Sequence, residues 1–84
     1  MPTILNINGF RFVIWPSDHE PPHVHVFKGK GEAKVYIGSG EMAPSFVLIH
    51  DLTKREARQI WDIVAEHQNQ LLNAWEGIHG NLDN

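Results

Sequence analysis

The sequence predicts an α+β protein with an antiparallel sheet of four to five strands, covered on one face by one long C-terminal helix. Short runs of β-branched and aromatic residues, separated by glycine and proline, fill residues 3–50. Helical spacing of apolar residues appears only after Thr53. With 84 residues, we expect a single domain over 1–84, ordered over about 3–78 and frayed over 79–84.

The first two strands are predicted at Thr3–Ile7 and Phe10–Trp15. Asn8-Gly9 lies between them, and this dipeptide favours a tight hairpin because both turn residues must tolerate positive φ. Residues 16–22 contain three prolines, which cannot continue a ladder of backbone hydrogen bonds. We therefore expect a loop after the first hairpin.

A second hairpin is predicted from His23–Phe27 and Glu32–Ile37, joined by a glycine- and lysine-rich turn at residues 28–31. Residues 38–40 read Gly-Ser-Gly and indicate a further break. The apolar run Ser45–His50 then predicts a fifth strand.

One amphipathic helix is predicted over Lys54–Glu76. Thr53 and Glu56 have the spacing of a capping box at its start, and Gly77 is a plausible C-cap. Its apolar stripe consists of Ala57, Ile60, Val64, His67, Leu71 and Trp75. The helix has to cover the sheet, because nothing else in the chain can bury this stripe.

The composition narrows the classes of function. The net charge of −3 disfavours a purely electrostatic nucleic-acid binder, although residues 1–40 carry four basic and three acidic residues against three and seven in residues 41–84. There is no cysteine, which excludes disulfides and thiolate metal sites and suits a reducing cytosol. The start of the chain resembles no signal peptide, and no apolar run is long enough for a membrane span. We expect a soluble cytoplasmic protein that makes no membrane contact.

Alternation along the strands divides the side chains between two faces. Val24 and Val26 belong to an apolar set that should lie under the helix. The opposite face should carry Arg11, Trp15, His23, His25, Lys34 and Tyr36. Cationic and aromatic groups on an exposed sheet suit a partner protein or an unstacked base, and we select Trp15, Tyr36 and Glu20 as candidate binding residues. The alternative is ordinary cross-strand packing on the wet face of a sheet.

The His-x-His pair in the segment Glu20–Val26 is the strongest functional signal. His23 and His25 fall on the same side of a strand, so both rings can approach one ion or one reacting group. Without a metal, they could act as acid and base in RNA cleavage while Arg11 or Lys34 stabilises the phosphorane-like charge. These four residues are our candidate catalytic set.

Two other interpretations of the histidine pair remain open. A metal site would need a third ligand beside His23 and His25, and the candidates are Asp18, His19, Glu20 and His50. In the second interpretation the rings have no chemical role and bond carbonyl groups of the proline-rich loop. Neither a metal nor another cofactor is required by the sequence.

The other histidines are weaker candidates. His67 lies on the helical stripe and should be a satisfied core or boundary residue. His79 lies in the tail and is expected to be solvated, and His50 could cap the helix entry with Asp51.

Several short motifs stand out along the chain: Met1-Pro2-Thr3, Gly9 with Arg11 and Phe12, Pro21 to Val26, Gly31-Glu32-Ala33-Lys34, and Leu71, Leu72, Ala74 and Trp75. Together they resemble a family of bacterial proteins known as domain of unknown function 4160. The resemblance covers most of the chain. Gly38 to Leu52 matches least well.

The resemblance implies a component of a bacterial type II toxin–antitoxin pair. By this resemblance the chain would be the toxin-like member, neutralised by a cognate small antitoxin-like protein. The histidine pair with Arg11 and Lys34 indicates action on RNA, and a homodimer is compatible with the sequence. The alternatives are a non-catalytic module that binds protein or nucleic acid, such as an antitoxin or regulator, and a small metal-dependent enzyme. Whether the protein is an enzyme stays open at this stage.

Overall fold

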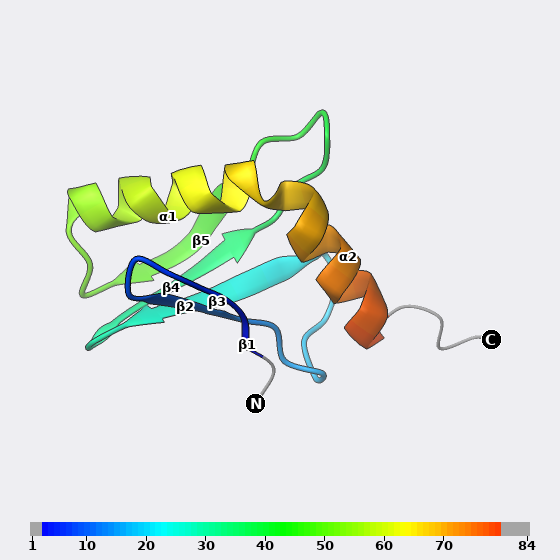
Figure 1. The fold of residues 1–84 in the computed structure, drawn as a ribbon, viewed down its shortest axis with the longest axis horizontal. Coiled ribbons are helices and arrows are strands. Elements are labelled where there is room, and N and C mark those ends of the chain that lie inside the picture. The colour runs from blue at the N-terminus through cyan, green and yellow to red at the C-terminus, as the bar shows by residue number, and fades with distance from the viewer. Residues whose placement is uncertain (1–2, 80–84) are drawn as a thin grey trace.

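The computed structural model describes residues 3–79, which form one five-stranded antiparallel sheet and two helices (Figure 1). The strands lie in the sheet in the order in which they occur in the chain. Their bounds are β1 Thr3–Ile7, β2 Phe10–Val13, β3 His23–Lys28, β4 Gly31–Tyr36 and β5 Ser45–His50. The predicted α+β class is confirmed, and the sheet has the larger of the two predicted strand numbers.

The two predicted hairpins are present. Asn8 and Gly9 have φ values of 55° and 81°, as the turn between β1 and β2 requires. β2 ends at Val13, two residues earlier than predicted, because the Trp15 amide bonds the side chain of Asp18 instead of a neighbouring strand. The third and fourth strands are each displaced by one residue at one or both ends.

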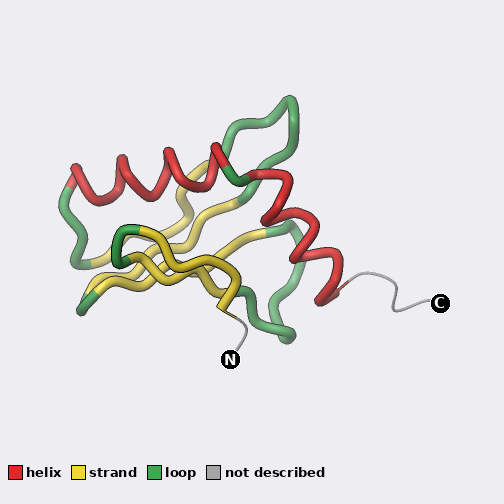
Figure 2. Tube along the Cα trace, in the orientation of Figure 1, coloured by secondary structure: helices red, strands yellow, loops and turns green. Residues whose placement is uncertain are grey.

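The prediction of one long helix is wrong, because the helical segment is divided into α1, Lys54–Glu66, and α2, Gln68–His79 (Figure 2). The division is at His67, whose φ of −107° and ψ of 22° depart from helical values. Its ring Nδ1 and its backbone amide both donate to the Ile63 carbonyl, each at 2.9 Å, so that one carbonyl accepts two bonds where the helix divides. α2 also runs past Gly77, the expected C-cap.

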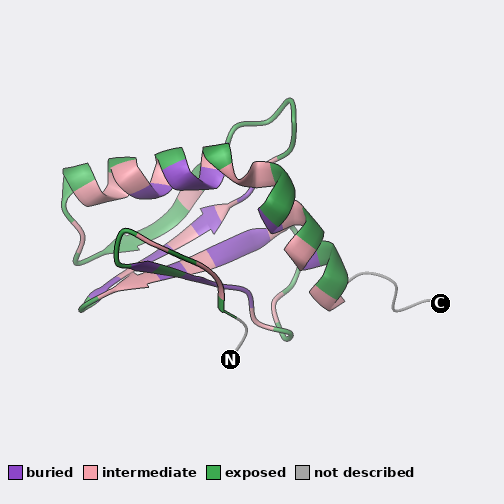
Figure 3. Cartoon of the chain, in the orientation of Figure 1, coloured by how far each residue is buried: buried purple, intermediate pink, exposed green. Residues whose placement is uncertain are grey.

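The core lies between the helices and one face of the sheet (Figure 3). Val24 and Val26 are fully buried there, as the alternation predicted. α1 contributes Ile60, Ile63 and Val64, and α2 contributes Leu71 and Trp75. α1 begins at the predicted capping box, in which the Thr53 hydroxyl accepts from the Glu56 amide and the Glu56 carboxylate accepts from the Thr53 amide.

β5 forms one edge of the sheet and is the least buried strand (Figure 3). Val47, Leu48 and Ile49 keep 45%, 44% and 45% of their surface exposed. Between residues 3 and 79 no helix is both long and apolar enough to cross a membrane. The expected fraying of residues 80–84 concerns a segment outside the described residues.

Candidate metal centre

The sheet register brings the two histidines of β3 together with polar residues of β4. His25 is the Cα partner of Lys34 on β4 and of Val13 on β2, and His23 is the partner of Tyr36. Partners in neighbouring antiparallel strands direct their side chains to the same face. The face opposite the helices therefore carries both imidazoles, one cation and one phenol.

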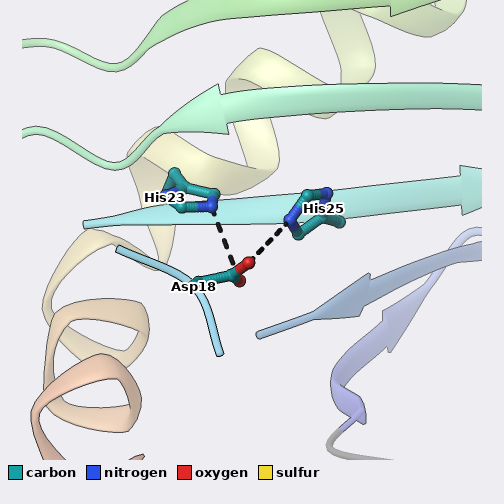
Figure 4. Close-up of side chains that lie close together, drawn as sticks. All are labelled: Asp18, His23 and His25. Carbon is teal, nitrogen blue, oxygen red and sulfur yellow. Dashed lines mark hydrogen bonds and ion pairs between the residues drawn. The ribbon is translucent and has the colours of Figure 1, made fainter. Parts of the chain in front are cut away.

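The proline-rich loop between β2 and β3 adds a carboxylate to this face. The Asp18 amide donates to the Trp15 carbonyl at 3.0 Å, and the Trp15 amide donates to Asp18 Oδ2 at 3.0 Å. These two reciprocal bonds form a tight turn that fixes the orientation of the Asp18 side chain. The carboxylate points at both rings (Figure 4).

Asp18, His23 and His25 form one compact cluster. His23 Nε2 is 3.5 Å from Asp18 Oδ2, and His25 Nε2 is 3.3 Å from Asp18 Oδ1. The ligand atoms that the three residues offer all lie within 4.8 Å of one another. The two rings meet edge to face, with centroids 5.1 Å apart and planes at 75°.

A second hydrogen bond determines the tautomer of His23. Its Nδ1 lies 3.0 Å from the Pro21 carbonyl oxygen, which can only accept, so Nδ1 carries a proton. In the neutral ring, Nε2 then presents a lone pair to the Asp18 carboxylate. Two electron-rich groups face each other, and a cation between them, either a proton on Nε2 or a metal ion, relieves this repulsion. A backbone partner on the far nitrogen is also the usual arrangement for a metal-binding histidine.

His23 lies on the predicted face but is more buried than an outward-facing residue should be. Only 4% of its surface is exposed, because the loop carrying Asp18 covers one side and the Trp75 ring, 5.2 Å away between centroids, covers another. The His25 side chain keeps 17% exposure. The bond to Pro21 is of the kind expected if the rings served only to hold the loop, and it leaves His23 Nε2 directed at the Asp18 carboxylate, as His25 Nε2 also is.

The Asp18 carboxyl is held in its ionised form. Partial burial raises its pKa, but the hydrogen bond from the Trp15 amide and the attraction of His23 and His25 lower it by more. The resulting pKa lies below the ordinary value of 3.8. An ionised carboxylate is the form that binds a metal ion.

The end of α2 packs against the proline-rich loop that carries Asp18. Trp75 donates from Nε1 to Glu20 Oε2 at 3.2 Å, and its ring stacks on His79 with centroids 3.9 Å apart. His79 Nε2 lies 3.0 Å from the Trp15 carbonyl oxygen, and its Nδ1 lies 3.2 Å from that of Trp75. His79 is thus half-buried against the loop, contrary to the expectation of a solvated tail residue.

A pocket of about 210 Å³ opens beside His23. It is lined by Ser17, Asp18, His19, Glu20, Pro21, His23, Lys34 and Tyr36. The cluster therefore has an open side on which a small anionic molecule would meet the Lys34 ammonium group and the Tyr36 ring.

Other candidate residues lie away from the cluster. Arg11 lies over the Phe27 ring, 5.6 Å from its centroid, and lines a separate cavity. His50 is exposed and lies 3.4 Å from Asp51. His19 lines the pocket but is not part of the three-residue cluster.

Sequence reasoning missed the contributions of Trp75 and His79. Trp75 was assigned to the core, where it does lie, but its indole nitrogen bonds the loop 55 residues earlier in the chain. The only local signal was an aromatic residue followed four positions later by a histidine, a spacing that puts both on one helical face.

The sequence model of the family described as "Domain of unknown function (DUF4160)" matches residues 9–76. The chain belongs to this family. The matched segment includes Asp18, His23 and His25, together with the Lys34 and Trp75 that surround them. No curated protein and no solved structure matches the chain.

Proposed function

We propose that Asp18, His23 and His25 bind one divalent metal ion and that the protein is a metal-dependent hydrolase acting on phosphoesters. The observation that carries the proposal is that the Nε2 atoms of both histidines face the partly buried carboxylate of Asp18. The other ring nitrogen of His23 is already bonded to the Pro21 carbonyl. A set of two histidines and one carboxylate is used by catalytic zinc sites.

Two distances in the cluster approach those of a small tetrahedral site. With metal–ligand bonds of about 2.0–2.1 Å, two ligand atoms of a tetrahedral zinc site lie about 3.3–3.4 Å apart. His23 Nε2 lies 3.5 Å from Asp18 Oδ2, His25 Nε2 lies 3.3 Å from Asp18 Oδ1, and the three ligand atoms lie within 4.8 Å of one another. Because the two shorter distances run to different carboxylate oxygens, the three side chains would draw together around an ion, and three protein ligands would then leave a fourth position for water.

Hydrolysis follows from the chemistry of such a site. An ion held by Asp18, His23 and His25 would lower the pKa of a bound water to about 7 and so would supply hydroxide at neutral pH. In hydrolysis a new P–O bond would form as the bond to the leaving oxygen breaks, and the leaving oxygen would take a proton from solvent. The Lys34 ammonium lines the pocket and would balance the charge of the phosphoryl oxygens.

Within this proposal, the biological substrate is RNA and the protein is the toxin-like member of a bacterial type II toxin–antitoxin pair in the cytoplasm. The support is the cation and the aromatic ring beside the cluster, which suit a phosphate and an unstacked base. Growth of cells that express the protein without a partner tests this role. Unimpaired growth, or growth arrest that persists in the double variant His23→Ala/His25→Ala, would contradict it.

The metal-dependent route is preferred to metal-free acid–base cleavage for geometric reasons. Both Nε2 atoms face the same carboxylate, whereas an acid and a base acting on one phosphate would have to face the substrate. His23 is also almost fully buried, and Arg11, the expected partner for the transition-state charge, lies over Phe27.

The enzymatic proposal is tested by hydrolysis of a chromogenic phosphodiester and of a labelled RNA by untagged protein. Activity should need Zn²⁺ or Mn²⁺, stop with a chelator and return when metal is restored. Lys34→Ala should lower kcat/KM at least tenfold without removing the metal.

Arg11→Ala is the matched control, because it removes a cation from the same face outside the cluster. It should leave hydrolysis of the small phosphodiester unchanged. Activity that survives the chelator, or that is lost equally in both lysine and arginine variants, would contradict the proposed role of the pocket.

The second candidate function is a non-catalytic binding module that uses the edge of β5. Its support is the outer edge of β5, which pairs with no strand on that side within residues 3–79, carries three exposed apolar residues and has no Asp, Glu, Lys or Arg over Ser45–His50. The occupant would be an extended apolar segment of a cognate antitoxin-like protein, added as a sixth strand. The same edge would serve in a homodimer.

Leu48→Lys tests this candidate, because a charge on an edge strand opposes addition of another strand. Loss of a stoichiometric partner or of dimerisation in this variant, with phosphodiester hydrolysis absent in the wild type, would favour the binding module over the enzyme.

A further inference from the structure

A second, apolar cavity adjoins the pocket of the candidate metal centre. Its volume is about 440 Å³, and Pro21 and Tyr36 belong to the walls of both cavities. Tyr36 is also the Cα partner of His23, so its ring stands one strand away from the cluster. We call this second cavity the Tyr36 cavity. It continues the metal-centre pocket towards the 38–44 loop.

Hydrogen bonds hold the 38–44 loop, which forms the far wall of the Tyr36 cavity, against α2. Gln68 Nε2 donates to the carbonyl oxygens of Ile37 and Met42, both at 2.9 Å. Ser39 and Met42 exchange two backbone hydrogen bonds, each of 2.9 Å. Gly38 has a φ of 78°, and a side chain there would collide with the Met42 carbonyl. The loop is therefore anchored to the helices before any ligand arrives.

The polar groups at this cavity are few. Among the lining residues, the Met42 carbonyl already accepts from the Gln68 side chain and from the Ser39 amide, each at 2.9 Å. Ser39 and Ser45 are exposed residues that line the cavity, and their hydroxyls make no hydrogen bond to another described residue. The remaining surface is apolar and comes from proline rings, Met42 and Leu72.

We infer that the Tyr36 cavity binds the base of a nucleoside phosphate whose phosphate group lies at the metal centre. The inference rests on the proposed function and names its substrate class. A base is a flat apolar face with polar edges, which suits the Tyr36 ring, two proline rings and two serine hydroxyls. The phosphate is the anion expected beside Lys34 and a divalent ion.

A ligand that occupies only one of the two adjoining cavities should bind more weakly than a ligand that occupies both. Inorganic phosphate would use only Lys34 and the metal ion, and a nucleoside would use only the Tyr36 cavity. A nucleoside monophosphate uses both without further loss of translational freedom, so its affinity should exceed that of either fragment. An aliphatic phosphate of equal size would lack the flat face and the polar edges.

Calorimetric titration of the zinc-loaded protein tests the inference. The ligands are inorganic phosphate, the four nucleoside 3′-monophosphates, the corresponding nucleosides and hexyl phosphate. At least one nucleotide should bind ten times more tightly than inorganic phosphate and than hexyl phosphate. Nucleotide affinity equal to that of inorganic phosphate, or matched by hexyl phosphate, would overturn the base site.

Two variants separate this inference from the proposed function. Leu72→Gln and Ala43→Phe alter the wall of the Tyr36 cavity, the first by polarity and the second by volume. Each should weaken nucleotide binding about tenfold and leave zinc content and the affinity for inorganic phosphate unchanged. Leu5→Gln, the same change at a residue that is also partly buried against the core but lies on β1 outside both cavities, should have no effect.

The outcomes are distinguishable. Failure of the wild-type protein to bind zinc overturns the proposed function itself. Normal zinc and phosphate binding, with nucleotide affinity equal in wild type and both wall variants, overturns the Tyr36 cavity alone. An equal fall in phosphate and nucleotide affinity in the wall variants does the same, because it indicates damage to the metal centre.

Discussion

At the residue scale, the cluster depends on which nitrogen of each ring faces the carboxylate. Alternation along β3 was sufficient to predict that His23 and His25 share a face, and it made the pair the leading candidate. Asp18 was one of four candidates for a third ligand. The sequence could not choose among them, because the loop conformation depends on contacts with residues near the end of α2.

His79 is expected to act as a positioning residue. His79→Ala removes the contact with the Trp15 carbonyl and the stacking on Trp75, which should lower the free energy of unfolding by about 1–2 kcal/mol. Because the Trp15 amide holds Asp18, the affinity for zinc should also fall severalfold. Chemical denaturation and calorimetry measure the two effects.

His50→Ala is the control for this prediction, since the His50 side chain is 68% exposed and lies outside the cluster. It should change neither quantity. If His79→Ala lowered stability and left zinc affinity at the wild-type value, the link between the end of α2 and the metal centre would be refuted.

At the element scale, the start of α1 was predictable and its end was not. The capping box is a local pattern, and both of its hydrogen bonds are present. At the break, the His67 ring bonds Ile63 and the neighbouring Gln68 bonds Met42 in the 38–44 loop. No spacing of apolar residues encodes those contacts.

The capping box predicts a pH dependence of stability. The hydrogen bond from the Thr53 amide, with the nearby Lys28 ammonium, lowers the pKa of Glu56 below its ordinary value of 4.5. A lowered folded-state pKa stabilises the fold above about pH 4.5, and this contribution is lost as pH falls through the lowered value. Glu56→Gln should flatten this part of the stability curve measured by urea unfolding at several pH values. An unchanged slope would count against the ionised cap.

Gln68 should be the residue on which the 38–44 loop depends most. Gln68→Ala removes the side-chain donor to the Ile37 carbonyl and one of the two donors to the Met42 carbonyl, which keeps the Ser39 amide, and should cost about 1–2 kcal/mol of unfolding free energy. Gln70→Ala, an exposed position on the same helix, should cost far less. Equal losses in the two variants, measured by thermal and chemical unfolding, would show that the loop is not anchored in this way.

At the scale of the whole molecule, the two faces of the sheet carry different kinds of side chain. One face is covered by α1 and α2 and supplies the core, and the other carries the histidine cluster and its pocket. The apolar alternation predicted this division. It could not predict that the loop before β3 folds back over the second face, which buries His23 and encloses the cluster.

The central claim is that the three-residue cluster binds a metal ion. Elemental analysis and calorimetric titration of untagged protein with Zn²⁺, Mn²⁺ and Fe²⁺ test it most directly. We expect about one ion per chain, and we expect Asp18→Asn and His25→Ala to abolish binding while His50→Ala retains it. Wild-type protein that binds no more metal than the Asp18→Asn variant would contradict the account.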